Sequence, residues 1–261
     1  MNSLTSHLRV SVLSMPIEPG SIDSNLAFVL TACEQLPANT DVLVLPELFT
    51  SGFHPKMDLS TAADAPEGRV IETLTNLAHV KGLAVAGSFM VKENGLYYNR
   101  GFFIEPSGER AFYDKHHLFT AGAEGSLLTA GAKLPPVIRF RGWNISIVTC
   151  YDLRFPEWCR NRNSSYDLLL VPANWPAERG YAWRQLLIAR AIENQAAVVG
   201  ANRSGEDKFG HYHDQTFIFD CMGQPIGQTE GDFVTADLDK AVQTQYRSDF
   251  PALKEWDSFI L

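Results

Sequence analysis

The chain has 261 residues, of which 45% are hydrophobic and 20% charged, so it can fill a large apolar core. This composition excludes an intrinsically disordered chain, a collagen-like repeat and a miniprotein that depends on disulfides. The formal net charge is −8 and no block of like charges interrupts the sequence. A general nucleic-acid or anionic-membrane surface is therefore not expected.

The spacing of the cysteines and the length of the apolar runs indicate where in the cell the protein is expected. The four cysteines are scattered and include no C-x-x-C pair, which argues against a disulfide framework or a structural zinc site. The first sixteen residues contain only short apolar runs, and no segment reaches the roughly 18 apolar residues of a membrane helix. We therefore expect a soluble cytoplasmic protein without nucleic-acid or membrane partners.

Short apolar segments predict strands in the same order in both halves of the chain. Continuous apolar runs closed by proline at 41–46 (DVLVLP) and 167–172 (DLLLVP) are typical of strands buried on both faces. Because further segments match at similar spacing, the sequence predicts an internal repeat. The other matched pairs are 10–13 with 145–148, 83–89 with 197–203, and 99–108 with 214–223.

Apolar residues at helical spacing predict helices over 22–36, 67–80 and 179–195. Ser21 or Asp23 is suited to cap the first of them. Two β-α-β-α-β-β halves predict a single α/β domain over residues 1–261, with internal pseudo-two-fold symmetry, two sheets packed face to face and helices outside.

The C-terminal segment, from about 241 to 261, is too apolar for a free tail. We expect it to dock on the body of the protein or on another subunit. It contains the large apolar or aromatic residues Tyr246, Phe250, Leu253, Trp256, Phe259 and Ile260, among others.

Cys150 is the first candidate for chemistry. In ISIVTCYDLRFP it lies where an apolar strand ends and a polar turn begins, ahead of a helix expected from Pro156. Backbone N–H groups of such a turn lower the pKa of a thiol and can hold an oxyanion. Most cysteines are inert core residues, which is the preferred interpretation of Cys33, Cys159 and Cys221. For Cys150 the position leaves both interpretations open.

Glu47 and Lys115 are the next candidates. A thiol needs a base, because only about 3% of it is ionised at pH 7. Glu47, in LPELFTSGF, ends a buried strand, where partial burial suits a carboxylate to accept a proton. Lys115, in FYDKHHLF, follows a strand and can hold an oxyanion or a carboxylate. Taken alone, Glu47 is better explained as an ordinary helix N-terminal or turn carboxylate, and the alternative for Lys115 is a solvated lysine beside Asp114.

Together these residues carry a family resemblance. Glu47, Lys115 and Cys150 match in order and spacing the Glu-Lys-Cys triad of the nitrilase superfamily of carbon–nitrogen hydrolases. LFTSGF, YDKHHLF and CYDLRFP together are most similar to its bacterial omega-amidase branch. The resemblance implies a four-layer αββα sandwich, which agrees with the internal repeat, and a homodimer or higher homo-oligomer. It extends from Val10 to about Asp239 and includes PANWP at 172–176, ARAIENQ at 189–195 and ANR at 201–203.

The resemblance also implies a reaction that needs no metal or organic cofactor. Cys150 attacks an amide carbonyl while Glu47 takes its proton, Lys115 and the backbone N–H of Tyr151 hold the oxyanion, and water hydrolyses the thioester to an acid. Glu124, nine residues after Lys115, is the candidate for a second glutamate of the family. The alternative for Glu124 is a surface loop carboxylate.

An omega-amidase substrate is the small-molecule amide of a short dicarboxylic acid, such as 2-oxoglutaramate or 2-oxosuccinamate. Its free carboxylate needs a cation, for which Arg154 and Arg203 are candidates by position. Arg154 is slightly better explained as a structural partner of Asp152. Phe119 and Trp175 are candidates for the pocket wall, although a buried aromatic residue more often belongs to the core.

Other functions stay open. A metal-dependent hydrolase would use His116, His117, His211 and His213, but no third ligand accompanies the last pair. A non-catalytic binding protein is disfavoured because the triad is intact. An aliphatic amidase, an N-carbamoyl hydrolase or a nitrilase would use the same triad.

Overall fold

The computed structural model of the protein describes residues 6–207, 210–212, 215–255 and 257. In this part of the chain, two mixed sheets pack face to face and a short hairpin lies apart from them. The larger sheet has the order β13-β14-β1-β2-β3-β4-β5. Its strands are β1 (His7–Leu13), β2 (Val42–Val44), β3 (Ala84–Glu93), β4 (Leu96–Ile104), β5 (Arg110–Asp114), β13 (Gln228–Glu230) and β14 (Phe233–Asp239).

The second sheet has the order β12-β9-β8-β7-β6. Its strands are β6 (Ile138–Phe140), β7 (Trp143–Ile147), β8 (Leu168–Ala173), β9 (Ala197–Asn202) and β12 (Phe217–Phe219). The separate hairpin pairs β10 (Glu206–Asp207) with β11 (Gly210–His211).

The two sheets repeat one pairing pattern. β1, β2 and β3 run parallel and β4 is antiparallel to β3, just as β7, β8 and β9 run parallel and β12 is antiparallel to β9. This is the internal repeat predicted from the matched segments, although position 214 of the last segment lies outside the described residues.

The layers explain why the parallel strands are apolar throughout. Val42 and Val44 of β2 belong to the core between the sheets, whereas Leu43 and Leu45 belong to the core under the outer helices. Successive side chains of a strand point to opposite faces, so a strand covered on both faces reads as a continuous apolar run. The αββα sandwich is therefore confirmed.

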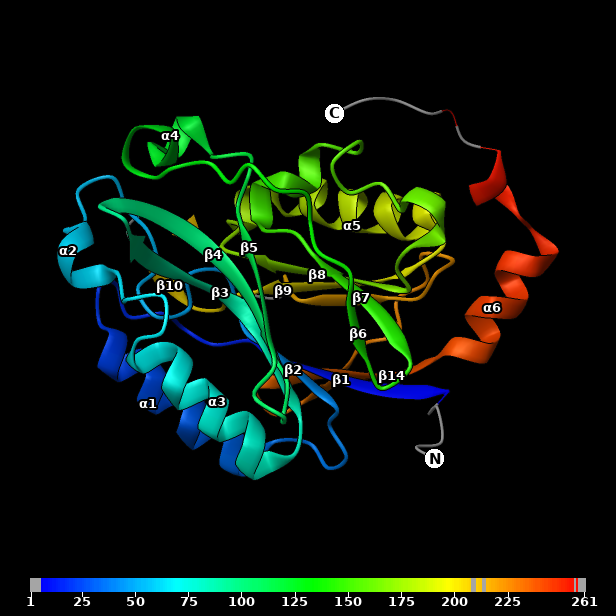
Figure 1. Cartoon of the computed structure of the whole chain (residues 1–261), viewed down its shortest axis with the longest axis horizontal. Helices are drawn as coiled ribbons and strands as arrows, with labels where there is room; N and C mark the ends of the chain where they lie inside the picture. Colours follow the sequence, from blue (N-terminus) through cyan, green and yellow to red (C-terminus); the bar gives the residue numbers. More distant parts are fainter. Residues whose placement is uncertain (1–5, 208–209, 213–214, 256, 258–261) are drawn as a thin grey trace.

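Helices cover both outer faces (Figure 1). α1 (Ile22–Ala32), extended by η1 (Cys33–Gln35), and α3 (Arg69–Lys81) lie side by side on the larger sheet, and α5 (Gly180–Asn194) lies on the opposite side of the sandwich. These are the three predicted helices. Ser21 lies at the N-cap position of α1, but its side chain makes no capping hydrogen bond with the backbone and donates to the hydroxyl of Ser24 instead. α5 approaches β9 so closely that a Cβ on Gly200 would lie 2.4 Å from Leu187, so only glycine fits there.

One predicted helix is absent, which corrects the expectation of a helix from Pro156. Residues 156–159 form turns, and only the short 3₁₀ helix η4 (Arg162–Ser164) follows. Asn163 has a left-handed backbone with φ of 55°, and the side chain of Asn161 donates to the backbone oxygens of Tyr166 and Asn194. Local side-chain hydrogen bonds of this kind compete with helix formation.

The remaining short helices lie in loops. They are α2 (Leu59–Ala62), η2 (Thr120–Gly122), α4 (Glu124–Leu127), η3 (Cys150–Arg154), η5 (Ala177–Arg179) and η6 (Ala252–Lys254). Among the helices that the structure describes, none is long and apolar enough to cross a membrane.

The last long helix, α6 (Lys240–Asp249), lies at one end of the sandwich (Figure 1). Lys240 and Arg247 both bind the buried carboxylate of Asp167, at 2.7 Å and 2.9 Å. Leu253 is buried beyond the helix, whereas Phe250 is 59% exposed. Positions 256 and 258–261, which include Trp256, Phe259 and Ile260 of the predicted docking segment, lie outside the described residues.

Candidate active site

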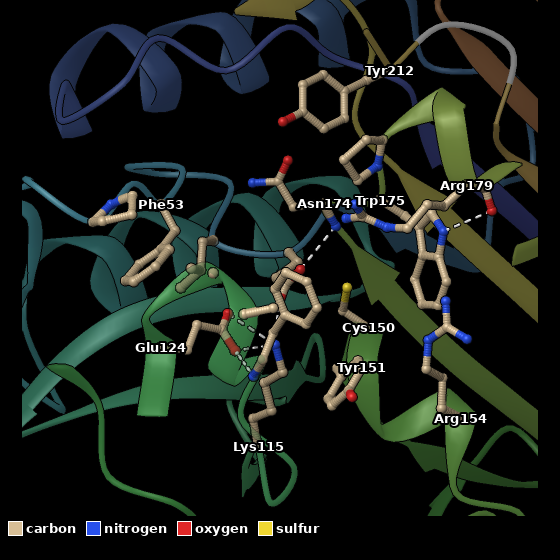
Figure 2. A pocket seen from close by; sticks show the side chains of 17 residues that line it. Phe53, Lys115, Glu124, Cys150, Tyr151, Arg154, Asn174, Trp175, Arg179 and Tyr212 are labelled. Atoms are coloured by element: carbon tan, nitrogen blue, oxygen red, sulfur yellow. Dashed lines mark hydrogen bonds and ion pairs between the residues drawn. The ribbon is translucent and has the colours of Figure 1, made fainter. Parts of the chain in front are cut away.

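The three candidate residues of the triad each follow a strand. Glu47 comes three residues after β2, Lys115 directly after β5, and Cys150 three residues after β7. Their side chains converge on one cavity of about 480 Å³, with the Cys150 sulfur facing its centre (Figure 2). Glu47 and Lys115 come from the first half of the chain and Cys150 from the second, so the cavity lies where the two halves meet.

Lys115 joins two glutamates. Its Nζ donates to Glu47 Oε1 at 2.8 Å and to both oxygens of Glu124, at 3.0 Å and 2.8 Å. Glu124 also accepts a hydrogen bond from the backbone N–H of Phe119 at 2.8 Å. The sequence alternative of a surface carboxylate at position 124 is wrong, because this residue is only 5% exposed.

Burial and neighbouring charges together shift the pKa values of Lys115 and Glu124. Burial by itself would lower the pKa of Lys115, but the charges of Glu124 and Glu47 raise it well above its ordinary value. Burial raises the pKa of Glu124, and the Lys115 ammonium opposes that change. Lys115 therefore remains a cation in a site from which water is largely excluded.

Cys150 stands on a strained turn. It is the first residue of η3 and has a left-handed backbone with φ of 46°, which is rare for a residue with a side chain. Burial and then the charge of Glu47 raise its thiol pKa well above the ordinary value, while Lys115 and a backbone hydrogen bond from Asn174 oppose the rise. The thiol is therefore protonated at rest, which corrects the expectation that the turn lowers its pKa.

Asp152 ties the Cys150 turn to the segment after Lys115. Its fully buried carboxylate accepts hydrogen bonds from the backbone N–H of Thr149 at 3.2 Å, the backbone N–H of His117 at 2.8 Å and the hydroxyl of Tyr113 at 2.7 Å. These bonds hold the turn that carries the sulfur against the loop that follows the lysine.

Two arginines reach the cavity. The Arg154 guanidinium lies 4.7 Å from the centre of the Trp175 ring, and the Arg179 guanidinium lies 5.3 Å from the centre of the Phe119 ring. Both arginines line the cavity. The carboxylate of Asp152 takes its donors from other residues, and no ion pair between it and Arg154 occurs among the described residues.

Arg203 does not line the cavity. It is 2% exposed, pairs with Asp207 at 2.7 Å, donates to the backbone oxygen of Ile17 at 3.1 Å and lies 4.3 Å from the centre of the Tyr212 ring. Arg203 thus packs against the ring of Tyr212, whose side chain does line the cavity (Figure 2).

The other predicted site residues all lie on the cavity, and sequence reasoning missed several more. Tyr151, Phe119 and Trp175 are among the lining residues, as predicted. The missed residues with polar groups are Asn174, Arg179 and Tyr212. Asn174 and Arg179 follow β8 within and just after the PANWP motif, so this strand end carried a usable signal. Tyr212 had none.

The histidines of the metal alternative have other partners. His116 Nδ1 lies 2.6 Å from the backbone oxygen of Gly131, and His117 Nδ1 lies 2.9 Å from Asp152 Oδ1. His211 pairs with Glu206 at the surface, and His213 lies outside the described residues. In the part of the chain that is described, no three acidic, histidine or cysteine side chains are grouped to hold a metal ion.

Comparison with known proteins decides the family. Residues 9–248 match the model of the family described as carbon-nitrogen hydrolase. The chain belongs to the carbon–nitrogen hydrolase family. It is therefore a hydrolase of carbon–nitrogen bonds other than peptide bonds, and the resemblance inferred from Glu47, Lys115 and Cys150 is confirmed.

Relatives and solved structures of this family cover nearly the whole chain. The chain is 38% identical to Omega-amidase YafV of Escherichia coli K12, over 97% of this chain and 98% of that protein. It is 33% identical to the 2-oxoglutaramate amidase of Bacillus subtilis, over 94% of this chain and 96% of that protein. The crystal structure of XC1258 from Xanthomonas campestris, a CN-hydrolase superfamily protein with an arsenic adduct in its active site, is 34% identical, with a TM-score of 0.91 over 98% and 99% of the two chains.

Proposed function

We propose that this hydrolase is an omega-amidase that uses Cys150 to convert the omega-amide of a short 2-oxo dicarboxylic acid to the acid and ammonia. The observation that carries the proposal is the buried Glu47–Lys115–Glu124 group beside a cavity-lining thiol. The relatives named Omega-amidase YafV and 2-oxoglutaramate amidase supply the substrate class.

The first step joins thiol deprotonation to attack. Because burial and Glu47 keep the thiol protonated, Cys150 needs a base at the moment its sulfur bonds to the amide carbon. Glu47 accepts that proton, and the carbonyl π electrons move to oxygen to give a tetrahedral oxyanion.

Lys115 and the backbone N–H of Tyr151 stabilise this oxyanion. The Lys115 ammonium is held in place by Glu47 and Glu124, so little reorganisation is needed when negative charge develops. Glu124 supports catalysis by keeping Lys115 charged and oriented.

Ammonia release and hydrolysis complete the cycle. Protonated Glu47 donates its proton to the leaving nitrogen as the carbon–nitrogen bond breaks, leaving a thioester on Cys150. Glu47 then takes a proton from water as the water oxygen attacks the thioester, and the sulfur leaves with a proton. The products are the carboxylic acid and free enzyme.

The far end of the substrate meets Arg154 and Arg179. Both guanidiniums lie on aromatic rings that also wall the cavity, and a guanidinium binds a carboxylate through paired N–H groups. Arg203, the other candidate for this role, packs against the ring of Tyr212 and pairs with Asp207, so we assign it to the support of the cavity wall.

A substrate panel tests the proposal. Ammonia release is measured from 2-oxoglutaramate, glutamine, a simple aliphatic amide, an N-carbamoyl amino acid and a nitrile. We expect the highest kcat/KM with 2-oxoglutaramate. A preference for one of the last three would assign the aliphatic amidase, N-carbamoyl hydrolase or nitrilase activity instead. Absence of turnover on all five would contradict the proposal and leave a binding role.

A further inference from the structure

Asn99 touches the catalytic group from a position that the reaction above does not use. It lies in the middle of β4, is fully buried and does not line the cavity. Its side-chain Nδ2 donates to Glu47 Oε1 at 2.8 Å, the same oxygen that accepts from Lys115. The other carboxylate oxygen, Oε2, accepts from the backbone N–H of Asn174 at 2.8 Å.

The backbone of Asn99 fixes the lysine as well. Its carbonyl oxygen accepts a 2.9 Å hydrogen bond from the backbone N–H of Lys115. One residue of β4, which is paired with a strand on each side, therefore holds the carboxylate of Glu47 with its side chain and the main chain of Lys115 with its carbonyl. A shift of β4 would move both groups together.

The amide of Asn99 is not fully satisfied. Within the described part of the chain, its Oδ1 is buried and has no hydrogen-bond partner. A buried polar atom without a hydrogen-bond partner costs free energy. An asparagine whose role is only structural would therefore be expected to form hydrogen bonds through both Oδ1 and Nδ2. The amide orientation follows from its neighbour, because an ionised carboxylate accepts hydrogen bonds and would repel Oδ1.

We infer that Asn99 is a positioning residue that orients Glu47, so that the carboxylate is ready to accept the Cys150 proton. The hydrogen bond donated by Asn99 fixes the rotation of the Glu47 carboxylate, so that Oε1 is directed to Lys115 and Oε2 to the end of β8. This inference rests on the proposed role of Glu47 as the base.

Two replacements test it. Asn99→Leu keeps the approximate volume and removes the donor, whereas Asn99→Asp keeps the shape and replaces the donor with an acceptor. Asn161→Leu is the matched control, because Asn161 is also fully buried and its amide donates to backbone oxygens away from the cavity. For each variant, the thermal midpoint, kcat and KM for 2-oxoglutaramate are measured as functions of pH.

We expect both Asn99 variants to lower kcat by about tenfold or more with KM changed by less than about threefold. Asn161→Leu should lower the thermal midpoint and leave kcat within about threefold of wild type. A kcat within about threefold of wild type in both Asn99 variants, or an equal fall of kcat in Asn161→Leu, would overturn the inference.

A second readout separates this inference from the substrate assignment. The rate of Cys150 alkylation by iodoacetamide is followed against pH, which requires no amide substrate. If the wild type hydrolyses no amide but the alkylation profile still shifts in Asn99→Asp and not in Asn161→Leu, Asn99 positions Glu47 and the proposed substrate is wrong. If the alkylation profile stays in place and kcat is unchanged in both Asn99 variants, the inference about Asn99 is wrong.

Discussion

The backbone N–H of Asn174 donates a 2.8 Å hydrogen bond to Oε2 of Glu47, across the junction of the two sheets. Asn174 directly follows β8 of the second sheet, and Glu47 comes after β2 of the first, its equivalent strand in the repeat. The backbone N–H of Glu47 also donates to the oxygen of Ala173 at 3.3 Å. Two equivalent strand ends therefore meet and fix the base, so the site depends on the packing of both halves.

Only one of the four cysteines should react with a small alkylating reagent in the folded protein. Burial raises the pKa of Cys33 and Cys221 to about 11 and that of Cys159 to about 12, and these three do not line the cavity. Cys150 lines the cavity beside a base. Intact-mass analysis should show a single adduct in wild type and none in Cys150→Ala. A second adduct at the same rate would contradict the assignment.

Removing the charge of Glu47 and removing the charge of Lys115 should shift the pKa of the Cys150 thiol in opposite directions. After burial, the charge of Glu47 contributes most to the raised pKa of Cys150, and Lys115 opposes it. Glu47→Gln should therefore lower the pH of half-maximal alkylation, although it abolishes amide hydrolysis, and Lys115→Gln should raise that pH. Glu124→Gln should act like Glu47→Gln with a smaller shift. Shifts of the same sign in Glu47→Gln and Lys115→Gln would refute this account of the electrostatics.

Arg154 and Arg179 should discriminate charged from neutral amides. Arg154→Ala and Arg179→Ala should each raise KM for 2-oxoglutaramate by about tenfold, equivalent to about 1.4 kcal/mol, and leave KM for a neutral aliphatic amide nearly unchanged. Arg184→Ala is the control, because Arg184 lies on α5 and does not line the cavity. Arg203→Ala should change both KM values equally. Equal effects of Arg154→Ala and Arg179→Ala on both substrates would contradict carboxylate anchoring.

Asp167 should stabilise the fold without affecting catalysis. Its buried carboxylate binds Lys240 and Arg247 of α6 and accepts from the backbone N–H of Asn144. Asp167→Asn should lower the free energy of unfolding by about 2 kcal/mol in urea titrations. The exposed pair of Asp237 with Arg9 offers a control, and Asp237→Asn should cost about 0.5 kcal/mol or less. Equal losses in the two variants would argue against a special role for Asp167.

The alternation of apolar segments was enough to predict the sandwich. Runs such as DVLVLP are apolar throughout because Val42 and Val44 face one core and Leu43 and Leu45 the other. The helix expected after Pro156 was wrong because the hydrogen bonds of Asn161 and the left-handed backbone of Asn163 are tertiary and local details that periodicity does not encode.

Site residues that follow strands could be predicted from the sequence. Contacts between side chains far apart in the sequence could not. Glu47, Lys115 and Cys150 all follow strands, which made them visible as candidates. The orientation of Arg203 away from the cavity depends on Asp207 and Ile17, and the approach of Asn99 to Glu47 depends on the pairing of β3 with β4. The raised pKa of Cys150 also required knowledge of its burial beside Glu47.

The most direct test of the account is to look for the acyl-enzyme. Wild-type protein is mixed with 2-oxoglutaramate, quenched in acid during turnover and digested for peptide mass spectrometry. We predict a thioester of the substrate acyl group on the Cys150 peptide, removed by hydroxylamine and absent in Cys150→Ala, which should release no ammonia. Ammonia release that persists in Cys150→Ala, or an acyl group found on another residue, would contradict the central claim.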